Sequence, residues 1–268
     1  MPRNKSDKPN SRRPGRGKRG TAPGDARRNP YAVPECETLY GLHTVLEALG
    51  NPRRKVRRFL ASENAAKRFE TQIAASGHQP EVVRTSEITR MTGPDAVHQG
   101  LLLDASPLPA PELSQLIARP GPIVVLDQIT DPHNVGAVLR SCAAFAAAGL
   151  VMTARHSPSA SSVLAKSASG ALEHVPIAKV TNLARAIEEL KDSGVHCVGL
   201  DSDADDILEH AVSGDGRTAL VLGAEGKGLR QKTRETCSVL VRLDMPGAIR
   251  SLNVSNAAAL ALYIATHA

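Results

Sequence analysis

The chain has 268 residues, of which 41% are apolar, and carries a formal net charge of +6 at pH 7. This length predicts one large or two modest domains, and no apolar run approaches the ~20 residues that a transmembrane helix needs. Four cysteines without a CxxC pair argue against a disulfide scaffold and a zinc site, so we expect free thiols, no metal, no membrane contact and a cytoplasmic location.

Residues 1–30 form a basic segment with ten Lys or Arg against Asp7 and Asp25, whereas the rest of the chain has a net charge of −2. This segment has almost no apolar side chains, so it cannot offset the entropy cost of ordering and is predicted to be a disordered tail. Basic arms usually meet the phosphates of nucleic acids. A tail that only aids solubility is the alternative interpretation.

Residues 35–105 have the pattern of a small α/β domain, and the proline-rich stretch 106–121 that follows predicts a linker. The expected elements are helices at 40–49 and 64–76 and strands at 56–62, 81–85 and 100–104.

From residue 122 to 268, strand-like and helical segments alternate. The run IVVLD at 123–127 is typical of a strand buried in a parallel sheet. At 182–194, Leu183, Ile187 and Leu190 share one face of a predicted helix. The alternation predicts a second α/β domain, a doubly wound parallel sheet that binds ligands at the carboxyl ends of its strands.

Three loops of this second domain hold the candidate functional residues. The first leads from the strand at 123–127 into a helix that contains Asn134 and Arg140. Helical projection gathers the apolar residues of 135–145 on one arc and places Arg140 opposite that arc. Taken alone, Asn134 could be an ordinary N-cap and Arg140 an ordinary solvated side chain.

The second loop, at 223–229, has three glycines around Glu225. Glycines let backbone N–H groups approach a ligand, and a carboxylate can bind a hydroxyl or a cation. Their spacing, G-x-x-G-x-G, matches neither the dinucleotide fingerprint nor a P-loop. The dinucleotide-dependent oxidoreductases and Rossmann-type methyltransferases are therefore disfavoured.

In the third loop, Ser251, Asn253, Ser255 and Asn256 precede or open an alanine-rich helix. One capping residue would suffice to start that helix. Four small polar residues exceed this need and predict a polar pocket at the N-terminus of the helix, where side-chain amides and backbone donors can hold a polar ligand.

In this order, N-x-x-x-x-x-R, G-A-E-G-K-G-L and M-P-G-A-I-R-S-L-N-V-S resemble the three motifs of the SpoU (TrmH) family of RNA ribose 2′-O-methyltransferases, over residues 122–268. YGLHTVLEAL and HQGLLLDASPL are similar to the subgroup that methylates a guanosine of bacterial large-subunit ribosomal RNA. The resemblance implies a homodimer, a carboxy-terminal trefoil knot and a ribosomal-protein-like domain that binds RNA at 35–105. The implied partner is ribosomal RNA, free or in an assembling particle.

The resemblance also implies S-adenosylmethionine as the methyl donor and a set of site residues. The third motif departs from the subgroup, which commonly has Ile-Pro-Met where this chain has Leu243-Asp244-Met245. The catalytic positions are Asn134, Arg140, Glu225, Ser251 and Asn253. The cofactor positions are Gly223, Ala224, Gly226, Leu243, Met245, Gly247, Ile249 and Leu252.

The implied reaction is an in-line displacement in which a ribose hydroxyl attacks a sulfonium methyl group, with no need for a metal. Because a guanidinium rarely loses its proton, we expect Arg140 to stabilise the developing oxyanion or a neighbouring phosphate, while water or Glu225 receives the proton. Methylation of transfer RNA is the main alternative, since the motifs serve either substrate. A non-catalytic RNA-binding protein of ribosome assembly is a weaker one, because Arg140 and Asn253 are both present.

Overall fold

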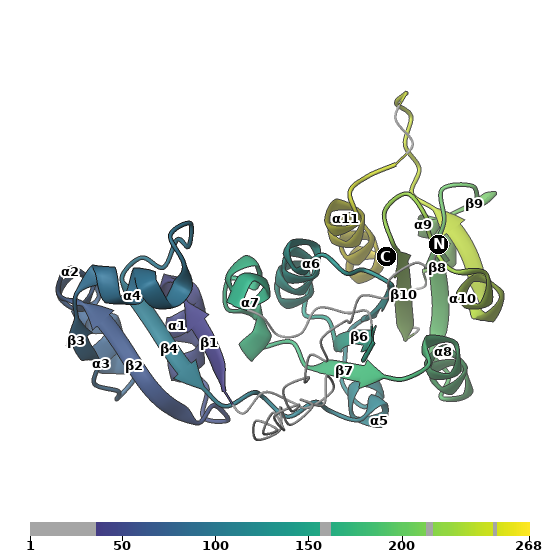
Figure 1. Ribbon diagram of the computed structural model, residues 1–268. Coiled ribbons are helices and arrows are strands. Elements are labelled where there is room, and N and C mark those ends of the chain that lie inside the picture. The colour runs from purple at the N-terminus through teal and green to yellow at the C-terminus, as the bar shows by residue number, and fades with distance from the viewer. Residues whose placement is uncertain (1–35, 156–161, 213–216, 249–250) are drawn as a thin grey trace, which may run out of the picture. The chain divides into compact units, whose positions relative to one another are not determined.

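A computed structural model of the chain describes residues 36–155, 162–212, 217–248 and 251–268 (Figure 1). The predicted tail at 1–30 lies outside the described residues. All the described residues fall within one unit, Val33–Ala268, which contains two β-sheets. The domain boundaries predicted from the sequence stay a prediction. In the described residues, no helix has the length and apolar character needed to cross a membrane.

The first sheet has four strands in the order β1-β4-β2-β3. Strands β2 and β3 run parallel, whereas β4 is antiparallel to both of its neighbours. The strands are β1 (Glu37–Tyr40), β2 (Val56–Ser62), β3 (Glu81–Val83) and β4 (Leu101–Ala105), and the helices are α1 (Leu42–Gly50), α2 (Glu63–Arg68), α3 (Glu70–Ala75) and α4 (Thr85–Thr92).

Helices cover both faces of this sheet (Figure 1). Phe59 and Ala61 of β2 share a core with residues of α1, α2 and α3. Leu60, which points to the other face, packs against Ile88 of α4. The expected helix at 64–76 is two helices, because Phe69 leaves helical geometry (φ −111°, ψ 21°) with its ring buried. Helix α4 was not predicted.

The second sheet has seven strands in the order β7-β6-β5-β10-β8-β11-β9, and all the neighbouring strands are parallel. Its strands are β5 (Ile123–Asp127), β6 (Gly149–Thr153), β7 (Ile177–Val180), β8 (His196–Leu200), β9 (Asp206–Ile207), β10 (Thr218–Gly223) and β11 (Val239–Arg242). The helices are α5 (Leu113–Ile117), α6 (Pro132–Ala144), α7 (Ser162–Ala168), the 3-10 turn η1 (Ala171–Glu173), α8 (Leu183–Asp192), α9 (Leu208–Ala211), α10 (Gln231–Thr236) and α11 (Val254–His267).

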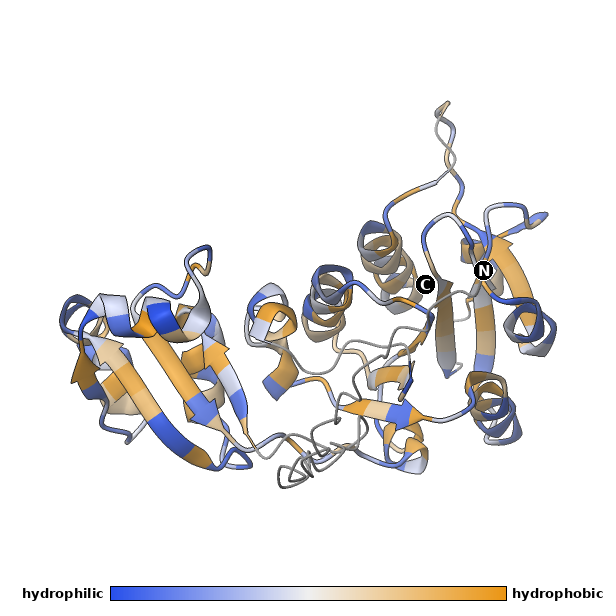
Figure 2. Cartoon of the chain, viewed as in Figure 1, coloured by the Kyte–Doolittle hydropathy of each residue, from blue (hydrophilic) through white to orange (hydrophobic). Residues whose placement is uncertain are grey.

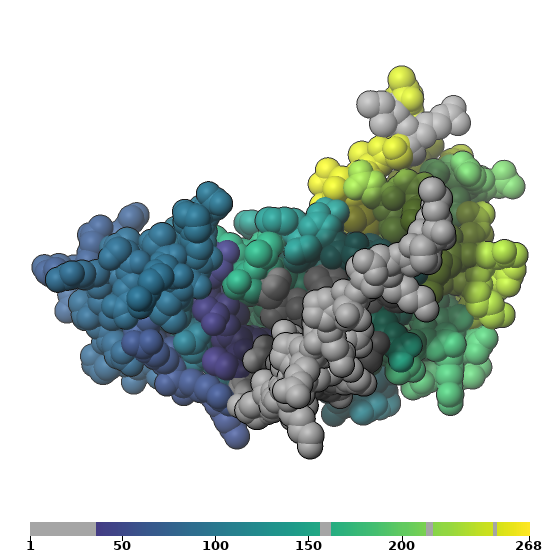
Figure 3. Space-filling model, in the orientation of Figure 1, coloured from purple at the N-terminus to yellow at the C-terminus, as the bar shows by residue number. Residues whose placement is uncertain are grey.

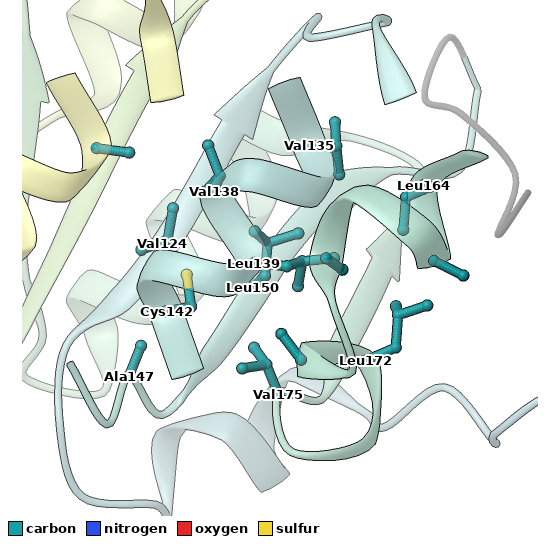
Figure 4. Close-up of a cluster of buried hydrophobic side chains, with 14 of the residues drawn as sticks. Val124, Val135, Val138, Leu139, Cys142, Ala147, Leu150, Leu164, Leu172 and Val175 are labelled. Carbon is teal, nitrogen blue, oxygen red and sulfur yellow. The ribbon is translucent and has the colours of Figure 1, made fainter. Parts of the chain in front are cut away.

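Successive residues of the central strand β5 point to opposite cores. Val124 belongs to a core that also contains residues of α6, α7 and α11, among them Val138 and Leu164, which Figure 4 labels. Val125 packs with Ile187 of α8 on the other face. Hydropathy follows the same plan, since the strands are largely apolar and the outer helix surfaces polar (Figure 2).

These observations confirm the predicted fold class, a parallel-sheet α/β part preceded by a small α/β part. Helix α8 matches the predicted helix, with the Asn182 side chain as its N-cap. Helix α5 lies inside the stretch expected to be a linker, because a capping box between Glu112 and Gln115 starts it and the buried Leu113 and Leu116 anchor it. The trefoil knot stays a prediction, since strand order does not describe chain threading.

Candidate active site

Two of the three candidate loops start at the same edge of the seven-stranded sheet. Strands β5 and β10 are parallel neighbours, and their last residues, Asp127 and Gly223, are register partners. The loops that follow these strands therefore leave the sheet side by side, at the edge where parallel α/β sheets bind ligands.

Asn134 and Asn253 meet although 119 residues separate them. Asn253 is the N-cap of α11, and its Oδ1 accepts hydrogen bonds from the backbone N (2.9 Å) and the Oγ (2.6 Å) of Ser255. Its Nδ2 donates to Oδ1 of Asn134 at 3.2 Å. This bond orients the amide of Asn134, whose N–H groups have no acceptor among the described residues and can donate to a ligand.

The interpretation of Asn134 as an ordinary N-cap is wrong. The N-cap of α6 is Asp131, whose carboxylate accepts a hydrogen bond from His133 N, with Pro132 in the first helical turn. Asn134 follows inside the helix and is half-buried. Its side chain is therefore not needed to start the helix.

Arg140 lies opposite the buried face of α6, as helical projection predicts. Val135, Val138, Leu139 and Cys142 are fully buried, whereas Arg140 is exposed. It follows Asn134 by six residues, a rise of about 9 Å. Among the described residues none is hydrogen-bonded to its guanidinium or paired with it. The described residues thus leave this cation without a partner and do not join it to the asparagine pair.

The glycine loop is a tight turn that other residues would not fit. Ala224 and Gly228 exchange two backbone hydrogen bonds, of 3.1 and 2.8 Å, and Gly226 and Gly228 have φ of +75° and +65°. A Cβ on Gly223 would lie 2.1 Å from the carbonyl carbon of Gly228. Glu225 is exposed at the tip of the turn. The turn therefore presents a carboxylate and a closely folded backbone to solvent.

The sequence analysis missed the residue that anchors this loop. Asp127 is fully buried, and its carboxylate accepts hydrogen bonds from the backbone N (3.0 Å) and the Nε (2.7 Å) of Arg230. Arg230 follows the glycine loop directly. Asp127 could have predicted such a contact from the sequence, because it ends the apolar run 123–127 and a buried charged side chain needs a partner.

A second missed contact fixes the first loop. Nδ1 of His133 lies 3.0 Å from Oγ of Ser167, on helix α7. No local pattern in the sequence connects these two residues. The contact depends on the packing of α6 against α7.

The remaining candidates lie in the segment before α11. Leu243 is buried and Met245 half-buried, whereas Gly247 is exposed and Leu252 is 41% exposed. Ser251 is exposed, and no hydrogen bond joins it or Glu225 to the asparagine pair within the described residues. Ile249 lies outside the described residues.

Comparisons with known proteins match both parts of the chain. The model of the SpoU rRNA Methylase family matches residues 121–263, and that of an RNA 2′-O ribose methyltransferase substrate-binding domain matches residues 38–111. The 23S rRNA (guanosine-2′-O-)-methyltransferase RlmB of Pseudomonas putida is 36% identical over 238 residues, which cover 85% of this chain and 95% of the relative.

The fold is similar to that of a solved structure. The SpoU methyltransferase AviRb of Streptomyces viridochromogenes, in complex with the cofactor AdoMet, superposes with a TM-score of 0.74 at 21% identity, covering 87% of this chain and 89% of that one.

Proposed function

This chain belongs to the SpoU rRNA methylase family, and from this premise we propose that it transfers a methyl group from S-adenosylmethionine to the 2′-hydroxyl of a guanosine ribose in large-subunit ribosomal RNA. The observation that carries the proposal is the bond between Asn134 and Asn253. It assembles an oriented amide donor at the edge of the sheet from which the glycine loop also emerges.

The residues of this edge fit S-adenosylmethionine. The backbone of the glycine loop, with Gly223, Ala224 and Gly226, offers polar groups for the ribose and amino acid parts of the donor. The half-buried Met245 and the exposed Leu252 offer apolar surface for an adenine ring, and we assign Leu243, whose side chain is buried, to a contact through its backbone. We assign the same contact region to Gly247 and Ile249. When bound, the donor supplies an electrophilic sulfonium methyl group.

The chain's own residues must orient the ribose and compensate charge. Asn134, held by Asn253, donates a hydrogen bond to an oxygen of the substrate, and the exposed Ser251 contributes a hydroxyl to substrate binding. The exposed guanidinium of Arg140 stabilises the oxyanion that develops on the ribose, or binds the neighbouring phosphate. Water or the exposed Glu225 receives the proton. Holding the hydroxyl in line with the methyl group supplies much of the rate increase.

The exposed side of α11 supports a homodimer. Leu260 is 38% exposed and Tyr263 51% exposed on this helix, and the Tyr263 ring lies against Phe145, the C-cap of α6, and stacks on His267. Large apolar and aromatic side chains at a surface are typical of protein interfaces. We assign this surface to a second copy of the chain.

A reducing cytoplasm, where ribosomal RNA is made and assembled, fits the thiols. All four cysteines are free. Burial raises the pKa of the Cys142 and Cys197 thiols to about 12. These two thiols are therefore unreactive core groups. We assign ribosomal RNA as the substrate in the cytoplasm, either free or in a pre-ribosomal particle.

The test is ribose methylation by the purified full-length chain. Ribosomal and transfer RNA from a strain that lacks the protein would each be incubated with radiolabelled S-adenosylmethionine, and the modified nucleotide mapped by its resistance to alkaline hydrolysis. We expect label in one guanosine of large-subunit ribosomal RNA. Label confined to transfer RNA would favour the alternative substrate, and no label in any RNA would favour a non-catalytic role.

A further inference from the structure

The four-stranded sheet has its own ligand-binding edge. Strand β2 leads into α2 on the face that Phe59 and Ala61 cover, whereas the parallel strand β3 leads into α4 on the opposite face. Where the helices after two neighbouring parallel strands leave on opposite faces, a crevice remains outside the carboxyl ends of the strands. α/β sheets bind ligands in such crevices.

Two adjoining clefts lie in this crevice. The first, of about 630 Å3, lies between α2, β3 and the start of α4 and is lined by Asn64, Lys67 and Arg84 among others. The second, of about 330 Å3, extends from Asn64 to Arg68 and His98. Asn64 and Thr85 line both clefts, so the two clefts adjoin. The lining residues belong to the stretch 62–100, which is blue in Figure 3. Its size is that of a site for small organic groups.

The crevice has uncompensated positive charge. Lys67 pairs with Glu63 at 3.0 Å. In the described part of the chain no carboxylate pairs with Arg68 or Arg84, and Arg68 lies over the ring of Phe69 at 5.2 Å from its centroid. Two exposed guanidiniums at the mouth of a cleft suit phosphate groups, which they can bind through paired N–H donors.

The other lining groups suit a nucleobase. Asn64 is exposed, and its amide makes no hydrogen bond to the described residues, so its donor and acceptor can both meet a base edge. Val82, on the edge strand β3, is 60% exposed and lines the first cleft. It offers apolar surface to the face of a base. The crevice thus has guanidiniums for the phosphates, the Asn64 amide for the edge of a base and the Val82 side chain for its face.

The wall of the second cleft is rigid. Gln99 and Gly100 have φ of +54° and +81°, and a Cβ on Gly100 would lie 2.3 Å from Oγ of Ser62. Nδ1 of His98 accepts a hydrogen bond from the backbone N of Gly100 at 3.0 Å, and its Nε2 lies 3.0 Å from Oγ1 of Thr89. A wall that is fixed before binding reduces the ordering cost of recognition.

We infer that this crevice binds an unpaired nucleotide of the RNA substrate, separate from the ribose that is methylated. Arg68 and Arg84 bind its flanking phosphates, and Asn64 binds the base edge. The inference rests on the proposed function and adds to it the residues through which the small sheet recognises RNA.

The test compares two double variants of the full-length chain. Arg68→Ala with Arg84→Ala is expected to raise the Kd for large-subunit ribosomal RNA about tenfold, and to flatten the plot of log K against log salt by roughly 1.4, from ~0.7 per single-stranded phosphate contact. Lys55→Ala with Arg57→Ala removes the same charge from the amino end of β2. This control is expected to change Kd by about twofold or less, because it loses only long-range attraction.

Asn64→Ala tests the base contact without changing charge. We expect the KM for RNA to rise about fivefold or more, with kcat, the salt slope and the Kd for S-adenosylmethionine unchanged. Equal losses in the two double variants, or RNA binding by the crevice variants at the wild-type level, would overturn the inference. A wild-type chain that methylates no RNA would instead refute the proposed function, and the binding comparison would still decide the role of the crevice.

Discussion

Removal of the buried Arg54 guanidinium is expected to cost more stability than any other single charge deletion proposed for this chain. The Arg54 side chain is 2% exposed; its NH1 bonds Glu37 at 2.8 Å, and its NH2 bonds Glu173 at 2.9 Å. NH1 also donates to the carbonyl oxygen of Ser106. Burial by itself would lower the pKa of Arg54, but the two carboxylates outweigh burial and raise the pKa above its usual value.

Arg54→Met leaves two carboxylates buried without their cation. Breaking a buried ion pair from one side costs about 3–5 kcal/mol. At roughly 2–4 °C per kcal/mol for a chain of this size, the thermal midpoint should fall by about 6–20 °C. Replacing the whole network, by Glu37→Gln and Glu173→Gln in addition, removes the unpaired charges. The triple variant should therefore recover most of the loss.

The assay is thermal and urea unfolding followed by circular dichroism, since the chain contains no tryptophan. Arg58→Met is the matched control, because Arg58 pairs with Glu81 at 2.9 Å but both side chains are largely exposed. Its midpoint should stay close to that of the wild type. If Arg54→Met were no less stable than this control, or the triple variant no more stable than Arg54→Met, the network would not have the energetic role argued here.

Four further outcomes are expected. Arg140→Ala should lower kcat by ~100-fold and leave the Kd for S-adenosylmethionine and the thermal midpoint nearly unchanged; normal turnover by the folded variant would exclude a catalytic role. Arg230→Ala leaves the buried Asp127 carboxylate without its partner, so it should loosen the glycine loop and raise the Kd for S-adenosylmethionine about tenfold in calorimetry. An unchanged Kd would show that the contact between Asp127 and Arg230 is dispensable. Burial lowers the pKa of His98 below its ordinary 6.5, so as the pH decreases below about 6.5 the unfolded chain takes up a proton that the folded chain does not, and the free energy of unfolding should fall. For His98→Gln the free energy of unfolding should depend less on pH, and an unchanged dependence would assign the effect to other groups. Deletion of residues 1–30 should flatten the salt dependence of RNA binding without changing the modified nucleotide, whereas an unchanged slope would favour the solubility interpretation.

Sequence patterns predicted what depends on local periodicity. The alternation of apolar strands and amphipathic helices predicted the doubly wound sheet, and the apolar arc of α6 predicted the exposure of Arg140, because both follow from which side chains share a face. Helix α4 was missed because Ile88 is its one fully buried residue. The break at Phe69 was missed because tertiary burial, not helix propensity, decides that position.

Site geometry could be predicted only in part. An excess of small polar residues and the spacing of the glycines identified the three loops, and the family resemblance selected the candidate residues within them. The contact between Asn134 and Asn253 depends on how α6 packs against α11, and the anchor of Asp127 on Arg230 joins residues 103 positions apart. No short window of sequence contains either pair.

The position of Asn253 also determines when the site can exist. A chain emerges from the ribosome N-terminus first, so β5 and α6 are made well before Asn253, which follows Asn134 by 119 residues. The bond to Asn134 cannot form until α11 has left the exit tunnel and packed on α6. A nascent chain whose α11 is still inside the tunnel therefore has Asn134 in place but lacks the partner that orients it.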